Sequence, residues 1–313
     1  MAFDRPLARL LLEVCRYTYA DHVGNAANAA DRADSLREIQ ARAPDAGTPI
    51  PVRDHTGVAT STALILPRSG VNVVCFMGTE TEFDNAKRQF TSLEDWLQNV
   101  RALPVAFDLP GARLECAVHR GFLSELRTVW PELLVQLGAH GGPGRPLHVT
   151  GHSQGGAEAA LATAAFIQAG FRVEATYTFA APRPGDARLR DFVAASTVAV
   201  HRIEFGNDIV PHMPPAAARV ARAEAASLGR IAAAAAAHIP DHDFVGVGSL
   251  CYGDGRSPFR IDLSERDEDA LFLLRFHALR TAQKDLIEHH HLRGTTAETA
   301  RGEVGNYTKI LDM

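Results

Sequence analysis

The chain has 313 residues, 46% apolar and 22% charged, a composition that excludes disordered, collagen-like and coiled-coil proteins. Its net charge is −5, and no segment concentrates basic residues, so we expect no nucleic-acid partner. The cysteines are isolated, with no CxxC pair, and are expected to be mostly buried thiols. They are Cys15, Cys75, Cys116 and Cys251.

The first 22 residues contain a short apolar run that Asp4 and Glu13 flank and interrupt. This pattern predicts an amphipathic helix and not a signal peptide. No later stretch is long and apolar enough to predict a transmembrane segment. The expected localisation is therefore either cytoplasmic or exported by a signal-independent route, and the sequence leaves this choice and the oligomeric state open.

Short apolar runs rich in β-branched residues alternate with amphipathic helical patterns along the chain. Strands are predicted at residues 61–66, 71–77, 147–150, 175–180, 198–205 and 244–252. Helices are predicted at 93–103, 122–137, 157–168, 187–195 and 269–288, and a final helix should contain Tyr307. This alternation predicts an α/β fold, with a mostly parallel sheet that helices cover on both faces.

A GxSxG sequence follows the predicted strand at 147–150 and precedes the helix at 157–168. It reads Gly151, His152, Ser153, Gln154, Gly155. A serine at a sharp strand-to-helix turn takes a strained backbone conformation, and only small residues fit two positions before and after it. The turn also places the serine at a helix N-terminus, which favours a developing negative charge. We therefore interpret Ser153 as a nucleophile and not merely as a helix cap.

Six sequence blocks together resemble the class 3 lipase family of α/β-hydrolases, with its bacterial members as the expected branch. They occur in the family's order across the middle half of the chain, which differs mildly from the family at Gln154, where leucine is usual. The blocks are VCFMGTE (74–80), SLEDWLQNV (92–100), VHRGFL (118–123), VTGHSQGG (149–156), TFAAPRPGD (178–186) and HRIEFGNDIVPHMPP (201–215). The resemblance implies an α/β-hydrolase fold and a serine esterase.

A catalytic carboxylate should follow the serine in the chain and lie in a loop after a strand. Asp208 meets both conditions, because it follows the predicted strand at 198–205. The alternative is an Asx-turn residue ahead of Pro211. The resemblance points to the same aspartate, because the NDIVPHMPP block carries the family's catalytic acid.

The catalytic histidine has several candidates after the predicted strand at 244–252. His277 lies within the predicted helix at 269–288, beside apolar positions such as Leu271 and Leu274, and is expected to pack or to face solvent. His289, His290 and His291 follow at the expected end of that helix. In bacterial family members the histidine tends to precede Leu or Met, so the resemblance favours His291, with His289 and His290 as alternatives.

An oxyanion hole needs at least two converging hydrogen-bond donors. The backbone N–H of Gln154 is expected to be one donor, and the resemblance of Gly78-Thr79 to the family's oxyanion block assigns Thr79 as the second. The resemblance also places a lid at about residues 80–94, where a surface helix packed into the core is an equal alternative. The Ala-rich segment 216–238 is expected to be an exposed helical insertion.

The sequence thus predicts a single α/β-hydrolase domain over residues 1–313, because the expected site residues run from Thr79 to His291. The expected activity is that of a serine carboxylester hydrolase, specifically a lipase that uses Ser153, Asp208 and His291 and needs no cofactor or metal. Its expected partner is a lipid or ester substrate, with transient contact to a lipid interface. The alternatives are a phospholipase A1 or acyltransferase with the same triad, or an inactive lipid-binding relative.

Overall fold

The computed structural model describes residues 2–21, 29–53, 62–78, 103–214, 243–280, 290, 292 and 306–312, with only the backbone described at 62, 276–280 and 306. The predicted lid at 80–94 and the Ala-rich segment at 216–238 lie outside these residues. So does the predicted helix at 93–103, apart from Leu103.

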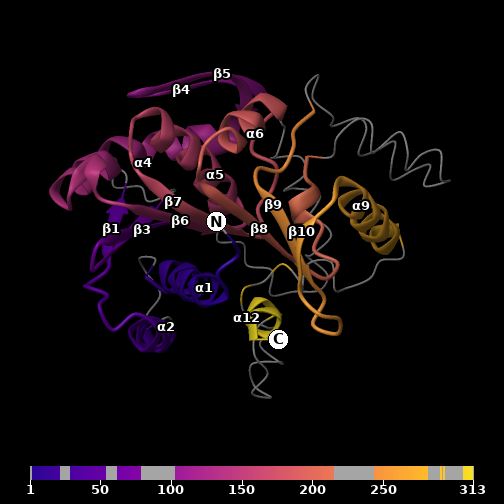
Figure 1. The fold of residues 1–313 in the computed structure, drawn as a ribbon, viewed down its shortest axis with the longest axis horizontal. Coiled ribbons are helices and arrows are strands. Elements are labelled where there is room, and N and C mark those ends of the chain that lie inside the picture. The colour runs from indigo at the N-terminus through magenta and orange to yellow at the C-terminus, as the bar shows by residue number, and fades with distance from the viewer. Residues whose placement is uncertain are drawn as a thin grey trace.

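An eight-stranded sheet forms the centre of the described chain, in the order β1-β2-β3-β6-β7-β8-β9-β10 (Figure 1). The five strands from β3 to β9 are parallel, and each outer pairing is antiparallel. The strands are β1 (Ile50–Arg53), β2 (Thr62–Arg68), β3 (Val71–Phe76), β6 (Leu147–His152), β7 (Val173–Phe179), β8 (Ala199–Phe205), β9 (Ser249–Gly253) and β10 (Arg260–Leu263). The prediction of a mostly parallel sheet is confirmed.

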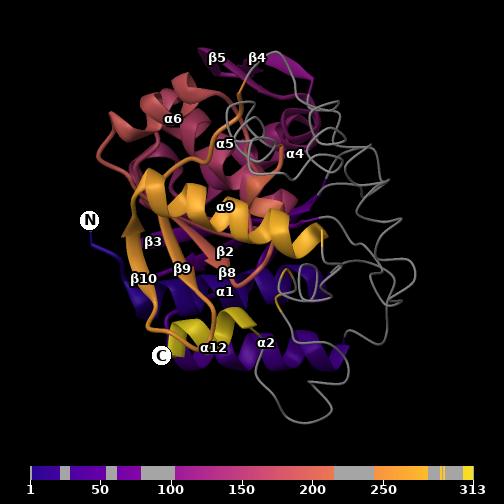
Figure 2. The ribbon, with the colours of Figure 1, turned by 90° about the vertical axis from the view of Figure 1, so that its right-hand side faces the viewer.

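Helices cover both faces of the sheet, as Figures 1 and 2 show. On one face, α4 (Arg120–Ala139), α5 (Gln154–Gln168) and α6 (Ala187–Ala194) bury an apolar core, with a hairpin of β4 (Pro104–Leu109) and β5 (Ala112–His119) beyond them. On the other face, α1 (Arg5–Ala20), α2 (Ala29–Arg42) and α12 (Asn306–Asp312) enclose a second core. Helix α9 (Glu265–Arg280) runs beside β9 and β10.

Helix α1 confirms the amphipathic helix predicted for the N-terminal segment. Asp4 caps it by accepting a hydrogen bond from the backbone N–H of Leu7 at 2.9 Å, and Pro6 is compatible with its first turn. Its apolar face packs on β2, β3 and β7, and its last turn carries Tyr19 toward β6. No helix among the described residues is long and apolar enough to cross a membrane.

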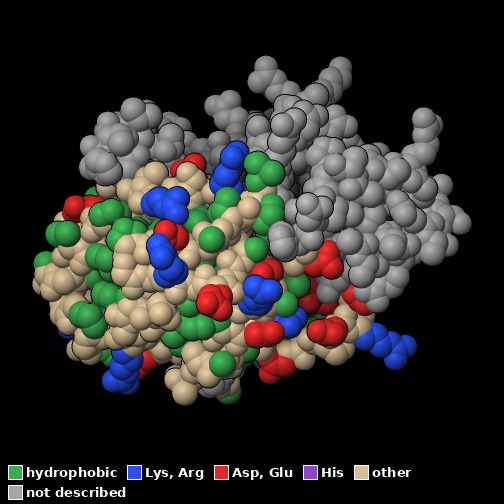
Figure 3. All heavy atoms as spheres, turned by 90° about the horizontal axis from the view of Figure 1, so that it is seen from above, with side chains coloured by type: hydrophobic (Ala, Val, Ile, Leu, Met, Phe, Trp, Pro, Cys, Tyr) green, Lys and Arg blue, Asp and Glu red, His purple; other side chains and the backbone are tan. Residues whose placement is uncertain are grey.

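The described surface in Figure 3 has acidic and basic side chains interspersed, with apolar atoms between them. Buried positions hold the cysteines, all four of which are free thiols, as predicted. Cys15 and Cys75 lie closest to one another among these, with 3.7 Å between their sulfur atoms. They join α1 to β3 through packing and a weak thiol contact.

The buried side chain of His119 should make the free energy of unfolding decrease in acid. It precedes α4, where its Nδ1 accepts from the backbone N–H of Phe122 at 3.4 Å, while its Nε2 is buried without a partner. Burial, together with the nearby Arg120 charge, lowers the pKa of His119 from 6.5 to about 4. The unfolded chain therefore binds the proton first as pH falls, so stability should decrease between about pH 6.5 and 4, by up to about 3 kcal/mol.

Urea unfolding at pH 8 and at pH 4.5 measures this effect in the wild type and in His119→Asn. Asparagine keeps a capping acceptor but does not titrate, so the variant should lose less stability on acidification. Burial also lowers the pKa of His148 and of His201, and the wild type and the variant share that contribution. Equal losses in the two proteins would contradict the assignment to His119.

Candidate active site

Ser153 lies at the sharp turn between β6 and α5, as its GxSxG context predicts. Its backbone has φ 56° and ψ −130°, a conformation that residues other than glycine rarely adopt. A Cβ at Gly151 would collide with the backbone of Gly155, and a Cβ at Gly155 with the carbonyl of Phe76. The two glycines therefore let β6, α5 and β3 approach closely enough to form the turn.

The hydroxyl of Ser153 lies next to an imidazole and a carboxylate. Its Oγ is 2.9 Å from Nε2 of His290, and Nδ1 of His290 is 2.9 Å from Oδ2 of Asp208. Because a carboxylate only accepts, Nδ1 donates to Asp208, which leaves Nε2 to accept the proton of Ser153. All three residues are buried, with exposures of 9% for Ser153, 0% for Asp208 and 6% for His290.

Asp208 receives two further hydrogen bonds that fix its carboxylate. The backbone N–H of Val210 donates to Oδ1 at 3.0 Å, and the hydroxyl of Tyr307 donates to Oδ2 at 3.3 Å. Burial and the Asp208 charge raise the pKa of Tyr307 well above its usual value, so its hydroxyl stays protonated and can donate. Helix α12 thus contributes directly to the environment of the acid.

The structure brings Ser153 and Asp208 together, and it puts His290 between them. His290 was an alternative in the sequence analysis, which favoured His291. His291 and His289 lie outside the described residues, as does the side chain of His277. The position that the sequence analysis gave to His291 is therefore occupied by its neighbour, and the bonds of His290 to Ser153 and Asp208 are the physical reason for the change.

The structure describes only part of the region in which the expected oxyanion hole lies. Thr79 lies outside the described residues, but Gly78 adjoins Ser153, since a Cβ at Gly78 would lie 3.2 Å from Cβ of Ser153. Gln154 is the first residue of α5, and its side chain donates to Oε1 of Glu158 at 2.9 Å. Burial raises the pKa of Glu158 well above its usual value. This polar side chain is thus held along α5.

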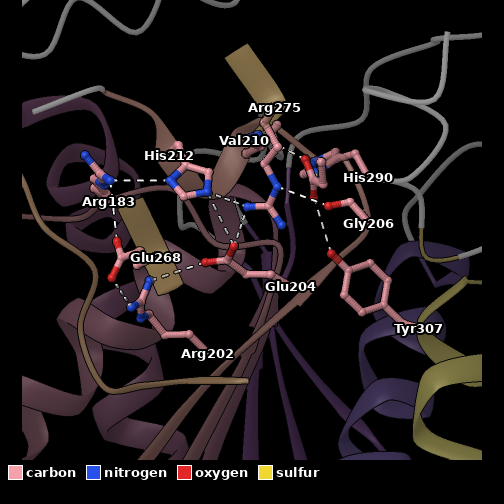
Figure 4. A network of polar contacts seen from close by, with 11 residues as sticks. Arg183, Arg202, Glu204, Gly206, Val210, His212, Glu268, Arg275, His290 and Tyr307 are labelled. Atoms are coloured by element: carbon pink, nitrogen blue, oxygen red, sulfur yellow. Dashed lines mark hydrogen bonds and ion pairs between the residues drawn. The ribbon is translucent and has the colours of Figure 1, made fainter. Parts of the chain in front are cut away.

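A buried network of arginines and carboxylates lies beside the acid loop (Figure 4). Arg275 of α9 is fully buried and donates to the carbonyl of Gly206 at 3.1 Å, to Glu204 at 2.5 Å and to Nε2 of His212 at 2.5 Å. Arg202 joins Glu204 to Glu268, at 3.3 Å and 3.0 Å. The network therefore attaches α9 to β8 and to the loop that carries Asp208.

The face by which α9 packs differs from the one predicted. Leu271 is buried, but Leu274, expected on the same apolar face, is 51% exposed. The buried face instead includes Phe272 and Arg275. The buried side thus keeps Leu271 and adds Arg275, whose ion pair with Glu204 a purely apolar pattern does not predict.

Tyr19 and the side chain of His152 are further residues of the site that the sequence analysis did not assign. Tyr19 lies in α1, and its hydroxyl is 2.9 Å from Nδ1 of His152. Nε2 of His152 is 2.7 Å from the carbonyl oxygen of His290. His152 could have been noticed because it adjoins Ser153, whereas no local pattern marks Tyr19.

The parallel sheet, its covering helices and the serine turn define an α/β-hydrolase fold, and solved structures agree. A triacylglyceride lipase of Rhizomucor miehei superposes with a TM-score of 0.59 at 20% identity, covering 88% of this chain and 94% of that one. A triacylglycerol lipase of Penicillium expansum gives 0.56 at 16% identity, covering 88% and 90%. At these identities the likeness concerns the fold.

Residues 73–218 match the family model of the lipases of class 3. A secreted mono- and diacylglycerol lipase of Fusarium solani is 31% identical over 162 residues, which are 47% of this chain and 47% of that protein. A lipase of Rhizomucor miehei is 32% identical over 139 residues, 42% and 37% of the two chains. These matches support the class 3 lipase family, and because they are fungal they give no support to a bacterial branch.

Proposed function

We propose that this protein is a serine lipase that hydrolyses acylglycerol esters through Ser153, His290 and Asp208. The observation that carries the proposal is the continuous hydrogen-bonded series from Ser153 Oγ through His290 to Asp208. The family match over 73–218 and the acylglycerol lipases among the relatives support the class of substrate. The localisation expected from the sequence stays a prediction.

In this mechanism Ser153 Oγ attacks the ester carbonyl while Nε2 of His290 takes its proton. Asp208 accepts a hydrogen bond from Nδ1–H of His290 and stabilises the imidazolium that forms. The backbone N–H groups of Gln154 and Thr79 are the proposed oxyanion donors. His290 then returns its proton to the leaving alcohol, and an acyl-enzyme remains.

Water hydrolyses the acyl-enzyme by the same route. His290 takes a proton from the water as it attacks, and the proton returns to Ser153 Oγ when the fatty acid leaves. The arrangement requires one residue for each role and no metal ion. If an alcohol attacked the acyl-enzyme in place of water, the reaction would be an acyl transfer that uses the same groups.

A fluorophosphonate probe and an acylglycerol assay test the proposal together. The probe should label Ser153, as identified by mass spectrometry of the adduct peptide, because the site activates this hydroxyl. The purified protein should also release fatty acid from mono- and diacylglycerol. Absence of labelling and of hydrolysis would support the inactive lipid-binding relative, and faster release from phospholipid would support a phospholipase A1.

A further inference from the structure

Two side chains from distant parts of the chain connect three backbone segments around Ser153. Tyr19 comes from α1, which lies outside the stretch that matches the family model, and His152 comes from the end of β6. The rings pack against each other, with 5.7 Å between their centroids. His152 in turn packs at 4.9 Å against the ring of His290.

The direction of each hydrogen bond follows from the groups involved. The carbonyl oxygen of His290 can only accept, so Nε2 of His152 carries a proton and donates at 2.7 Å. In the neutral imidazole Nδ1 is then an acceptor, and Tyr19 donates its hydroxyl proton to it at 2.9 Å. The same hydroxyl oxygen lies directly against Gly78, where an added Cβ would collide with it. The series therefore runs from Gly78 through Tyr19 and His152 to His290.

Each end of this series adjoins a group that the proposed reaction needs. Gly78 precedes Thr79, one of the proposed oxyanion donors, and is packed so closely that a Cβ there would collide with the hydroxyl of Tyr19. The other end holds the carbonyl of His290, whose imidazole takes the proton of Ser153. The series thus links the oxyanion side of the site to the base.

Tyr19 is suited to this role because its hydroxyl remains protonated. The residue is half-buried near Cys15 and Cys75, and the loss of solvent around its hydroxyl raises its pKa well above the usual value. A hydroxyl suits this position because it donates to Nδ1 of His152 and is small enough to lie against Gly78.

We propose that Tyr19 is a positioning residue of the active site, which packs against Gly78 directly and holds the backbone of His290 through His152, so that both stay in register with Ser153. The inference rests on the proposed function, because it assigns no chemistry of its own to Tyr19. Misplacing a reacting group by about 1 Å can cost about 100-fold in rate. A loss of position on both sides of Ser153 should therefore reduce the rate and leave substrate binding largely intact.

The principal test is Tyr19→Phe, which removes one oxygen and keeps the ring. It should lower kcat for a p-nitrophenyl ester by about 10- to 100-fold with KM changed less than about twofold. The affinity for an alkyl trifluoromethyl ketone, which forms a tetrahedral adduct with serine, should fall by the same factor as kcat/KM. Tyr17→Phe is the matched control, because it removes a tyrosine hydroxyl from the same helix outside this series, and it should retain wild-type values.

Two variants of His152 keep the test independent of how well Tyr19→Phe folds. His152→Gln retains an amide N–H that can donate to the carbonyl of His290, whereas His152→Leu cannot, so glutamine should preserve at least tenfold more kcat. In the His152→Leu background, Tyr19→Phe should cause little further loss, because the series is already broken.

Hydrolysis and labelling of the wild type separate the two proposals. An inactive, unlabelled wild type would refute the proposed function itself. An active wild type together with a Tyr19→Phe variant that keeps kcat and ketone affinity within twofold would overturn the role of Tyr19. Additive losses from Tyr19→Phe and His152→Leu would overturn it as well.

Discussion

Replacing His290 by alanine should lower kcat for ester hydrolysis by about 10⁶-fold, as removal of a triad histidine does in serine hydrolases. Without the imidazole, Ser153 Oγ has no acceptor for its proton at 2.9 Å, and the charge of Asp208 has no imidazolium to stabilise. Hydrolysis of p-nitrophenyl butyrate at pH 8 measures the loss. Ser153→Ala should lose about as much, and the double variant should lose little more, because the two residues act as one unit.

The neighbouring histidines provide the matched controls for this prediction. His289→Ala, His291→Ala and His277→Ala should each stay within a few fold of the wild type. Each makes the same chemical change within a few residues of the site or in the helix before it. If His291→Ala lost several orders of magnitude and His290→Ala did not, the assignment from geometry would be wrong and the original expectation right.

The positions of Ser153 at its turn and of Asp208 after β8 were predictable because local patterns determine them. Ser153 follows from the glycines that its turn requires, and Asp208 from its place after a buried strand. The choice among three consecutive histidines was not predictable in this way, since all share one sequence context. It depends on the distant contact between His152 and the carbonyl of His290, which no pattern near residue 290 reveals.

The central strands were predictable for a similar reason, and the edges were not. The buried runs in β3, β6, β7 and β8 are rich in β-branched residues, as parallel strands require. Edge strand β10 is largely exposed, and α2 buries only Ser35 and Ile39, so neither shows a clear apolar pattern. The β4–β5 hairpin could have been found, because its strands alternate around a Pro-Gly turn, with Gly111 at φ 81°.

The polar core beside β8 was also beyond prediction, because a charged residue is expected at the surface. Glu204 lies in a strand whose residues are all buried, and its carboxylate is compensated by Arg202 and Arg275. These arginines come from β8 itself and from α9, which are separated by a long stretch of chain. Only the three-dimensional arrangement shows that the charges neutralise one another.

Arg275→Met should lower the free energy of unfolding by about 3–5 kcal/mol, since removing one partner of a buried ion pair leaves the other charge uncompensated. Methionine fills a similar volume, so the loss would report the missing guanidinium. Glu204 would keep its ion pair with Arg202 but lose the one with Arg275, and the carbonyl of Gly206 would lose its donor. Urea unfolding followed by tryptophan fluorescence measures the change.

Arg266→Met is the matched control, because it makes the same substitution at an exposed position of the same helix, where a change within about 0.5 kcal/mol is expected. Arg275→Lys should lie between the two, since lysine restores the charge without the planar fork that reaches both Glu204 and Gly206. Adding Glu204→Leu to Arg275→Met should recover much of the stability, because the uncompensated carboxylate is then gone. If the double variant were less stable than Arg275→Met by the full cost of a second buried substitution, the network would stabilise through packing and not through its charges.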